Sequence, residues 1–436
     1  GENRNINATI LTIVEHPDII TPRILSAEVD YNVGVLIIRA SETIDSTPKS
    51  LVNVSLIHIA NDSSNTGGGD YVVLEGTTVT AYDDVVFTIL LTEKQRAYAI
   101  SHSGTQGGDK VAITIEVLPG AVKDIGTNPC GSFYNIPVSE TADTTPPLIL
   151  RSVLNLSTGL LEIIVNETID TTPKDLVNPS KVVLYNSSNG ANVRLANAVI
   201  KQQDEVSVFI TLTEKQRVEA IALSSTNGGD TTALTLSVEA GAMQDIGTNK
   251  NNRFDGIFVT EVADTAPPAL KSASINLTQG ELILVFSETV NRDFLFNVSG
   301  VSISNRTTAF SPIKVSLEGA VESSVVEKGP LRIVLQLNEV QRSYAHVTSS
   351  QPGGDGHDGY IHIERDKIMD MATNKNLKSN DVVLVSFPDI VNPRVSNVSV
   401  ELTNGTLFVV FSESIINDAA YIFLKQMFIS NEGEQK

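Results

Sequence analysis

A set of short motifs recurs along this chain in constant order, at a spacing of about one domain. Asp143-Thr-Thr-Pro-Pro147 returns as Asp264-Thr-Ala-Pro-Pro268, and shorter copies begin at Asp18 and Asp389. The four aspartates are therefore 125, 121 and 125 residues apart. Repetition at a fixed period is the signature of a chain built from copies of one structural unit. We therefore expect a series of similar domains rather than one large domain.

Four further markers keep the same spacing and define the repeats. They are a Glu before a short turn (Glu42, Glu167, Glu288, Glu413), a Glu-x-Gln-Arg segment (Glu93–Arg96, Glu214–Arg217, Glu339–Arg342), a Gly-Gly-Asp turn (107–109, 228–230, 353–355) and an Asp-x-x-x-Asn loop (124–128, 245–249, 370–374). Alignment on these markers predicts five segments. These are the last strand of a preceding repeat at 1–18, three Ig-like repeats at 19–142, 143–263 and 264–388, and an incomplete repeat at 389–436.

Within a repeat, short apolar and β-branched runs alternate with polar turns, which is typical of strands. The second repeat has seven such runs: Leu148–Leu154, Leu160–Val165, Lys181–Tyr185, Val193–Ile200, Val206–Leu212, Thr232–Val238 and Phe254–Val262. Thr213-x-x-Gln216 has the form of a capping box and predicts one short helix. Thr92 with Gln95 repeats this signal, and Asn338 with Gln341 keeps a competent cap. The sequence therefore predicts an all-β fold of tandem seven-stranded Ig-like β-sandwiches, each with one short helix, in an extended array.

The motifs Pro-Pro-x-Leu, Gly-x-Leu-x-x-x-Phe-Ser-Glu and Asp-x-x-Thr-Asn resemble the tandem Ig-like repeats of bacterial and algal surface proteins. The likeness is closest to motility- and flagellum-associated repeat proteins, and the copy at 280–288 carries it best. The chain has no Trp and one cysteine, so the Trp and Cys pair of antibody domains are absent. The resemblance covers nearly the whole chain. It implies a surface or filament role and supplies no catalytic residues.

The charge and composition narrow the function further. With 31 Lys and Arg against 51 Asp and Glu, the net charge is −20, and no basic stripe could neutralise phosphates, so we expect no nucleic-acid partner. The sequence has no run of about 18 apolar residues, so we expect no membrane span. Cys130 lies in a predicted loop and is either a free thiol or pairs between chains. Neither a Gly-x-Ser-x-Gly elbow nor a phosphate loop occurs, and we expect no enzymatic activity.

N-glycosylation acceptors are abundant, which predicts an extracellular or cell-surface glycoprotein bearing N-linked glycans. Asn-x-Ser/Thr with x other than Pro occurs at eleven positions, most of them at predicted turns or strand ends. These positions are Asn7, Asn53, Asn61, Asn155, Asn166, Asn186, Asn276, Asn297, Asn305, Asn397 and Asn404.

Acidic markers at the repeat boundaries raise the possibility of calcium sites. Asp143 and Asp264 stand at the boundaries, Glu167 and Glu288 end a predicted strand, and Asp245 lies in a loop before the last strand. Oxygen ligands from a linker and two loops suit Ca²⁺. The alternative is that these aspartates are ordinary turn residues and the glutamates are solvated strand ends.

Three functions are compatible with these features. The first is a structural protein, a protomer or segment of a cell-surface fibre whose copies assemble head-to-tail, the strand at 5–16 of one chain adding to residues 389–436 of the next. The second is an adhesin that binds carbohydrate or another cell surface, for which an aromatic cluster near Tyr360 is the candidate site. The third is a set of accessory domains from a larger enzyme.

Overall fold

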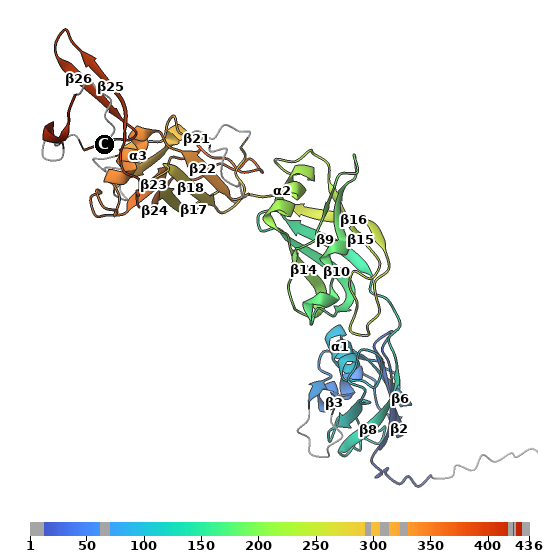
Figure 1. The fold of residues 1–436 in the computed structure, drawn as a ribbon. Coiled ribbons are helices and arrows are strands. Elements are labelled where there is room, and N and C mark those ends of the chain that lie inside the picture. Colours follow the sequence, from blue (N-terminus) through green and yellow to red (C-terminus); the bar gives the residue numbers. More distant parts are fainter. Residues whose placement is uncertain are drawn as a thin grey trace, which may run out of the picture. The chain divides into compact units, whose positions relative to one another are not determined.

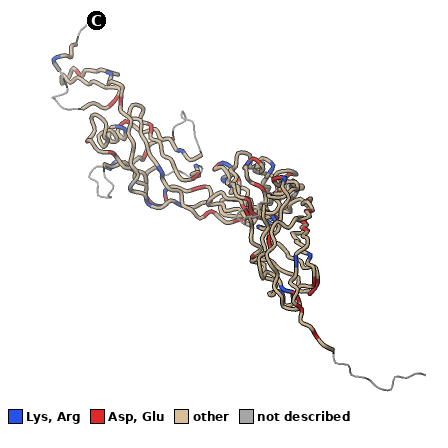
Figure 2. Tube along the Cα trace, turned by 90° about the horizontal axis from the view of Figure 1, so that it is seen from below, with Lys and Arg blue, Asp and Glu red and all other residues tan. Residues whose placement is uncertain are grey.

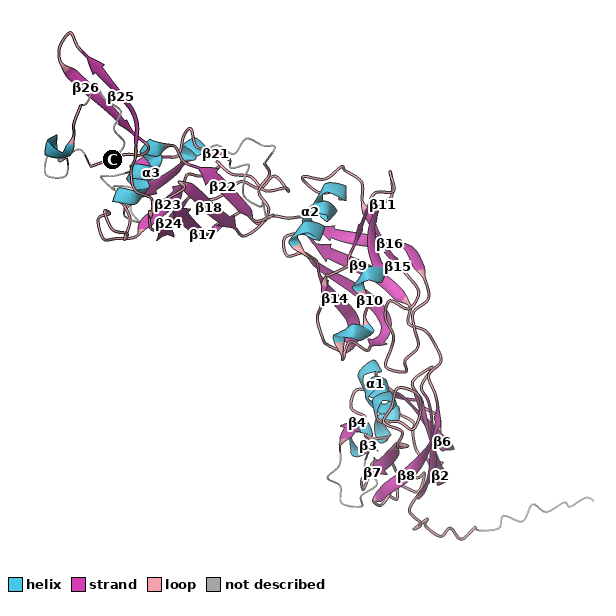
Figure 3. Ribbon diagram, in the orientation of Figure 1, coloured by secondary structure: helices cyan, strands magenta, loops and turns pink. Residues whose placement is uncertain are grey.

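The computed structural model describes residues 13–61, 70–292, 298–305, 314–322, 330–416, 422 and 424–429. These residues form three eight-stranded sheets, one two-stranded sheet and three α-helices (Figures 1 and 3). By residue contacts the chain divides into two compact units. The N-terminal unit comprises 1–155, 159–213 and 233–261, and the C-terminal unit comprises 156–158, 214–232 and 262–436. The all-β prediction is therefore confirmed.

The first sheet of the N-terminal unit has the strand order β4-β3-β7-β8-β1-β2-β6-β5. Its elements are β1 (Ile24–Asp30), β2 (Val35–Ile44), β3 (Ile57–Ala60), β4 (Tyr71–Val73), β5 (Thr78–Val79), β6 (Asp84–Leu90), α1 (Glu93–Ser101), β7 (Thr114–Val117) and β8 (Phe133–Thr141). Strand β8 changes partner along its length: its first half pairs antiparallel with β7, and its second half pairs parallel with β1. Eight strands therefore form one continuous hydrogen-bonded sheet.

The sheet curls around its own hydrophobic core. Alternate residues of β1 and β2, such as Val29 and Leu36, are buried beside Ile59 of β3 and Ile115 of β7. This alternation is what a half-buried strand requires, because successive side chains point to opposite faces. Isoleucine, valine and leucine dominate this core, as the aromatic-poor composition predicts.

The second sheet repeats this topology with the order β12-β11-β15-β16-β9-β10-β14-β13. Its strands are β9 (Ile149–Asn155), β10 (Leu160–Ile169), β11 (Val182–Asn186), β12 (Asn192–Arg194), β13 (Val199–Ile200), β14 (Glu205–Thr211), β15 (Leu234–Val238) and β16 (Phe254–Val262). The prediction of seven strands is wrong here. The run Val193–Ile200 is two strands, because the backbone turns at Asn197 (φ 68°) and its halves pair at opposite edges, with β11 and with β14.

The C-terminal unit contains α2 (Glu214–Leu223), a third sheet with the same order of strands, α3 (Glu339–Val347) and a separate hairpin. The third sheet consists of β17 (Leu270–Asn276), β18 (Glu281–Phe286), β19 (Val301–Ser304), β20 (Lys314–Ser316), β21 (Val321–Glu322), β22 (Arg332–Gln336), β23 (Gly359–Ile363) and β24 (Ser379–Phe387). The hairpin is formed by β25 (Val395–Glu401) and β26 (Thr406–Phe411).

Short 3₁₀ helices complete the described elements: η1 (Lys49–Leu51), η2 (Val54–Leu56), η3 (Lys174–Leu176), η4 (Pro179–Lys181), η5 (Val298–Gly300) and η6 (Leu424–Gln426). No helix within the described ranges is long and apolar enough to cross a membrane. Residues 1–12, which hold most of the predicted donor strand and Asn7, lie outside the described residues, and 13–23 contain no strand.

Two of the predicted capping boxes are present. At α1 the Thr92 hydroxyl accepts from the Gln95 amide, while the Gln95 side chain accepts from the Thr92 amide at 2.9 Å. Asn338 and Gln341 make the same reciprocal pair at α3. Gln95 also donates to the carbonyls of Val73 and Glu75, both at 2.9 Å, which fixes α1 against the end of β4. The cap thus determines where the next residue, Arg96, points.

Candidate functional site

Arg96 connects the first repeat to the second. Its side chain is 9% exposed and donates from Nη1 to Asp143 Oδ2 and from Nη2 to Glu167 Oε2, each at 2.8 Å. Glu93, one turn earlier on α1, holds the guanidinium through Nε at 2.7 Å. Nη1 also donates to the carbonyl of Tyr31. We call the group of Arg96, Glu93, Asp143 and Glu167 an arginine clamp.

The glutamate of the clamp also binds the following repeat directly. Glu93 Oε1 accepts a hydrogen bond from the backbone amide of Thr168 at 2.7 Å, immediately after Glu167. One short segment of α1 therefore contacts both the linker aspartate and the end of β10. Such charge-assisted hydrogen bonds are shorter and stronger than neutral ones.

The clamp occurs three times with the same atoms. The second clamp joins Arg217 to Glu214, Asp264 and Glu288, and the third joins Arg342 to Glu339, Asp389 and Glu413. The amides of Thr289 and Ser414 take the place of Thr168, at 2.7 and 2.6 Å. In all three the arginine precedes the linker aspartate by 47 residues and the glutamate by 71.

A third carboxylate joins the two clamp carboxylates at each of two boundaries. Oxygen atoms of Asp143, Glu167 and Asp245 lie within 4.8 Å of one another, and all three residues are buried. Asp264, Glu288 and Asp370 form an equivalent buried set. We call these groups carboxylate triads. The five residues predicted as calcium ligands, Asp143, Glu167, Asp245, Asp264 and Glu288, all belong to these triads, and Asp370 is the additional member.

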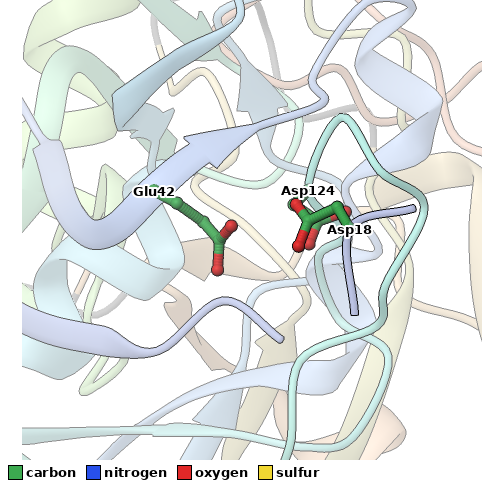
Figure 4. Close-up of side chains that lie close together, drawn as sticks. All are labelled: Asp18, Glu42 and Asp124. Atoms are coloured by element: carbon green, nitrogen blue, oxygen red, sulfur yellow. The ribbon is translucent and has the colours of Figure 1, made fainter. Parts of the chain in front are cut away.

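A further triad is more open to solvent. Asp18, Glu42 and Asp124 have oxygens within the same 4.8 Å, but Asp18 is exposed and Glu42 is half-buried. Figure 4 shows the carboxylates of Asp18 and Asp124 side by side, with the Glu42 side chain directed toward them. The triads thus share one arrangement and differ in burial.

At each buried triad, the asparagine that ends the Asp-x-x-x-Asn loop holds the carboxylates together. Asn249 donates from its amide to Asp245 Oδ1 at 2.8 Å, and from its side chain to Asp245 Oδ2 at 3.0 Å and to the Asp143 carbonyl at 3.1 Å. Asn374 makes the same three contacts to Asp370 and Asp264. The Asp-x-x-x-Asn marker is therefore the segment that links the loop to the linker.

The environment disfavours the charged form of several triad carboxylates. Burial raises the pKa of Glu167 to about 7, with Arg96 opposing the rise and Asp245 and Asp143 adding to it. Burial, with the adjacent carboxylate of Asp143, raises the pKa of Asp245 to about 6. In the second triad burial, followed by the charge of Asp264, raises the pKa of Glu288 to about 8. Buried carboxylates that share one site repel each other in this way.

The glycine marker allows the two repeats to approach closely. Gly107 has φ 91°, and a Cβ at this position would lie 2.0 Å from the carbonyl oxygen of Ile246, beside the Asp245 loop. Gly228 has φ 85°, and a Cβ there would lie 2.1 Å from the carbonyl oxygen of Met371. Any side chain would be strained in this backbone conformation and would collide with the neighbouring loop. Both glycines are thus required by the repeat boundary.

The described glycosylation acceptors differ in exposure. Asn53, Asn166, Asn397 and Asn404 are exposed, whereas Asn61, Asn155, Asn276 and Asn305 are half-buried. Asn186 is 1% exposed, at the end of β11, and this burial argues against glycan attachment there. Asn7 and Asn297 lie outside the described residues. The acidic residues, red in Figure 2, are spread along the tube.

Two other candidates from the sequence have little access to a partner. Cys130 is 2% exposed, packs in the first core and donates to the Leu118 carbonyl, so its thiol faces protein and not solvent. Tyr360, the candidate adhesin residue, is half-buried in β23. The segment 291–296 of the same repeat, whose sequence also departs from the other copies, lies mostly outside the described residues.

The sequence markers did not reveal the role of the arginines. Arg96, Arg217 and Arg342 were recognised as members of a repeated Glu-x-Gln-Arg segment, without a partner. The signal that could have identified the clamp is the constant distance of 47 residues from each arginine to the linker aspartate. A charged pair kept at fixed spacing across a domain boundary indicates a contact between domains.

Comparison with known proteins gives only weak likenesses. No protein-family model matches the chain, and no curated protein matches it. The structure of domains 1–6 of the surface-layer protein SbsC is 10% identical and covers 92% of this chain and 59% of its own, with a TM-score of 0.18. The N-terminal part of the same bacterial protein covers 44% of each chain at 10% identity and a TM-score of 0.18. The chain thus spans less than two thirds of these S-layer structures.

A third likeness is to the adhesin domain of Epf from Streptococcus pyogenes. That structure is 13% identical and covers 53% of this chain and 74% of its own, with a TM-score of 0.17. TM-scores this low support no conclusion about function.

Proposed function

We propose that this chain is a structural glycoprotein of the cell surface or extracellular space, a non-enzymatic array whose repeats are fastened to one another by the arginine clamps. The observation that carries the proposal is the exact recurrence of the clamp at three repeat boundaries. Domains joined only by a flexible linker need no such contact. A buried, fully bonded arginine is instead suited to hold neighbouring repeats in a fixed orientation.

The clamp limits motion because its members come from separate segments. Arg96 binds the linker through Asp143 and the following domain through Glu167, while Glu93 binds the Thr168 amide. Removing one partner of a buried ion pair typically costs about 3–5 kcal/mol, because the other charge stays buried without compensation. The proposal therefore predicts that each boundary loosens when its arginine is removed.

Small-angle X-ray scattering of the purified chain tests the effect of the clamp arginines on the boundaries. We expect the double variant Arg96→Ala with Arg217→Ala to broaden the distribution of intramolecular distances, because two boundaries lose their clamps. The control is Arg253→Ala, whose side chain is 65% exposed and whose ion pair with Asp255 lies on the surface. Identical distributions for the double variant and the wild type would refute a clamped array.

Assembly of copies into a fibre is the finer part of the proposal. The hairpin β25–β26 exposes apolar side chains along both strands, among them Val398 (53%), Val400 (50%), Phe408 (51%) and Val410 (52%). Exposed apolar strands with free edges are typical sites for pairing with another chain. We propose that the segment 5–16 of one copy adds to this hairpin in the next as an extra strand.

Multi-angle light scattering over a range of concentrations tests the assembly. We expect wild-type chains to form larger species that disappear in Phe408→Lys and on deletion of residues 1–18. Phe258→Lys is the matched control, because Phe258 is also exposed (66%, against 51% for Phe408) but lies in β16, which has a strand on each side. Assembly that survives both changes would exclude head-to-tail exchange.

A further inference from the structure

We propose that the two buried carboxylate triads, Asp143/Glu167/Asp245 and Asp264/Glu288/Asp370, each bind one Ca²⁺ ion at the repeat boundary. The proposal rests on the geometry and charge of the triads and not on the role of the chain in an array. A calcium ion would connect the linker, the strand end and the loop of one domain beside the arginine clamp of the preceding one.

The boundary holds more carboxylates than cationic side chains. Glu93, Asp143, Glu167 and Asp245 bring four carboxylates to the single guanidinium of Arg96. Asp143 is 3% exposed, Glu167 4% and Asp245 1%, so water can screen them little. Ionised carboxylates removed from water must be paired or coordinate a metal. The triad therefore favours either a bound cation or a bound proton.

One buried oxygen of the first triad lacks a hydrogen-bond partner. Glu167 Oε2 accepts from Arg96, whereas Glu167 Oε1 has no partner among the described residues and is buried. Leaving a buried charged acceptor unsatisfied costs more than the roughly 1–3 kcal/mol of a neutral group. An oxygen beside two other carboxylates, without a donor, is the arrangement expected of a metal ligand.

The spacing and the ligand type both suit calcium. Two oxygens bound to one Ca²⁺ at about 2.3–2.6 Å can be separated by no more than about 5 Å. The triad oxygens lie within 4.8 Å of one another. All three ligands are carboxylates, with neither sulfur nor imidazole, which favours a hard cation over zinc or copper. Ca²⁺ accepts the irregular geometry of a linker and two loops more readily than Mg²⁺ does.

The proton is the competing ligand, and pH separates the two. A calcium ion must displace that proton, because metal ligands bind in their deprotonated form. Calcium affinity should therefore increase as the pH rises from about 6 to 8.

The exposed triad provides an internal comparison. Asp18, Glu42 and Asp124 offer the same ligands, but Asp18 is exposed. Glu42 Oε1 also lacks a partner among the described residues. Calcium affinity depends on ligand charge and on the rigidity of the site. We expect this triad to bind calcium more weakly than the two buried ones.

Isothermal titration calorimetry of the full chain, stripped with EDTA and titrated with CaCl₂ at pH 7.5, measures the sites directly. We expect two comparable sites and a weaker third one, and weaker binding of MgCl₂. Glu167→Gln and Glu288→Gln should each remove one strong site, with affinity at that triad falling at least about tenfold. Glu28→Gln, on the exposed face of β1, is the matched control and should change nothing.

Thermal unfolding distinguishes a ligand role from a merely structural one. Replacing Glu167 by Gln keeps a side-chain oxygen that can accept from Arg96 Nη2, so the calcium-free variant should still unfold cooperatively. The same variant should lose the increase in Tm that calcium gives to its boundary. A calcium response unchanged in both glutamine variants would refute the proposal.

A second result would also overturn the calcium proposal. If calcium produces neither heat nor a shift in Tm between about pH 6 and 8, while stability still varies with pH, the triads hold protons and not metal. Scattering of the arginine variants tests the clamped array separately. Loss of calcium binding with an intact array, or the reverse, would therefore identify which proposal has failed.

Discussion

The hairpins β17–β18 and β25–β26 have the same local structure and very different surroundings. Each pairs six residues in antiparallel register with an irregularity after the first pair, Leu270 with Phe286 in one and Val395 with Phe411 in the other. Leu282 of β18 is fully buried, whereas Leu407, at the equivalent position of β26, is 39% exposed. The strands that cover β18 in its curled sheet have no described counterpart over β26.

The clamps next to these hairpins also differ in how deeply they are buried. Arg217 and Arg342 make the same ion pairs, but the side chain of Arg217 is 5% exposed and that of Arg342 is 11%. Asp264 and Glu288 also meet Asp370, which comes from a loop far along the third repeat. The comparison shows that the hairpin and the clamp are local features, whereas burial and the triad require a complete repeat.

Removing the arginine of each clamp should give the largest difference. Arg217→Met leaves the buried Asp264 and Glu288 and the half-buried Glu214 without their cation, and we expect it to destabilise the boundary by about 3–5 kcal/mol. Arg342→Met should cost less, because water reaches its partners more easily. Urea unfolding combined with hydrogen exchange of the β17–β18 and β25–β26 segments measures both. Equal costs at the two boundaries would contradict the assigned effect of burial.

The matched leucines test the hairpins themselves. Leu282→Ala should cost about 2–5 kcal/mol, because it leaves a cavity in the third core. Leu407→Ala should change the stability of the monomer by less than about 0.5 kcal/mol. Both values come from urea unfolding at low protein concentration. If the free-energy cost of Leu407→Ala grows as the protein concentration rises, another copy covers β26, which supports assembly.

The pH dependence of the third repeat should follow Glu288. Its pKa is about 8 in the folded chain against an ordinary value of 4.5, so the folded state binds this proton more tightly than the unfolded state. The associated stability is present below pH 4.5 and is lost as the pH rises to about 8. Asp370 shifts in the same direction, while Glu214 and Arg217 stay ionised throughout this window.

Urea midpoints measured in EDTA at about pH 5 and 8 test this expectation. Glu288→Gln should flatten the profile, and Glu28→Gln should leave it unchanged. Calcium should reduce the loss of stability at the higher pH. A wild-type profile already flat in EDTA would contradict the raised pKa of Glu288.

The features that the sequence predicts correctly depend on residues close together in the chain. The capping boxes at Thr92 and Asn338 depend on residues three positions apart, and both form as predicted. The sequence does not disclose the division of Val193–Ile200 into two strands, because only Arg194 and Asn197 interrupt an otherwise apolar run. Only pairing with two opposite sheet edges, a tertiary effect, separates its halves.

The boundary site was predictable in part for the same reason. Asp143, Glu167 and Asp245 stood out because each recurs with the repeat, and repeated acidic residues can be selected without knowing their contacts. Their burial could not be anticipated, since acidic residues are mostly exposed. Arg96 was not linked to them because its partners are 47 and 71 residues away, in the next repeat.

Glycan attachment should give the smallest energetic effect and a clear difference between regions. Asn404 lies exposed in the turn of β25–β26, whereas Asn186 is 1% exposed at the end of β11, with Oδ1 accepting from Ser188. An oligosaccharide needs an acceptor that the transferase can reach, so secretion from eukaryotic cells should give glycosylated Asn404 and unmodified Asn186. Glycopeptide mass spectrometry measures both, and Asn178, followed by Pro, is the negative control. Because Asn404 is solvated, Asn404→Gln should alter stability by less than about 0.5 kcal/mol. Substantial occupancy at Asn186 would mean that glycans attach before β11 pairs, so that exposure in the folded repeat does not determine the pattern.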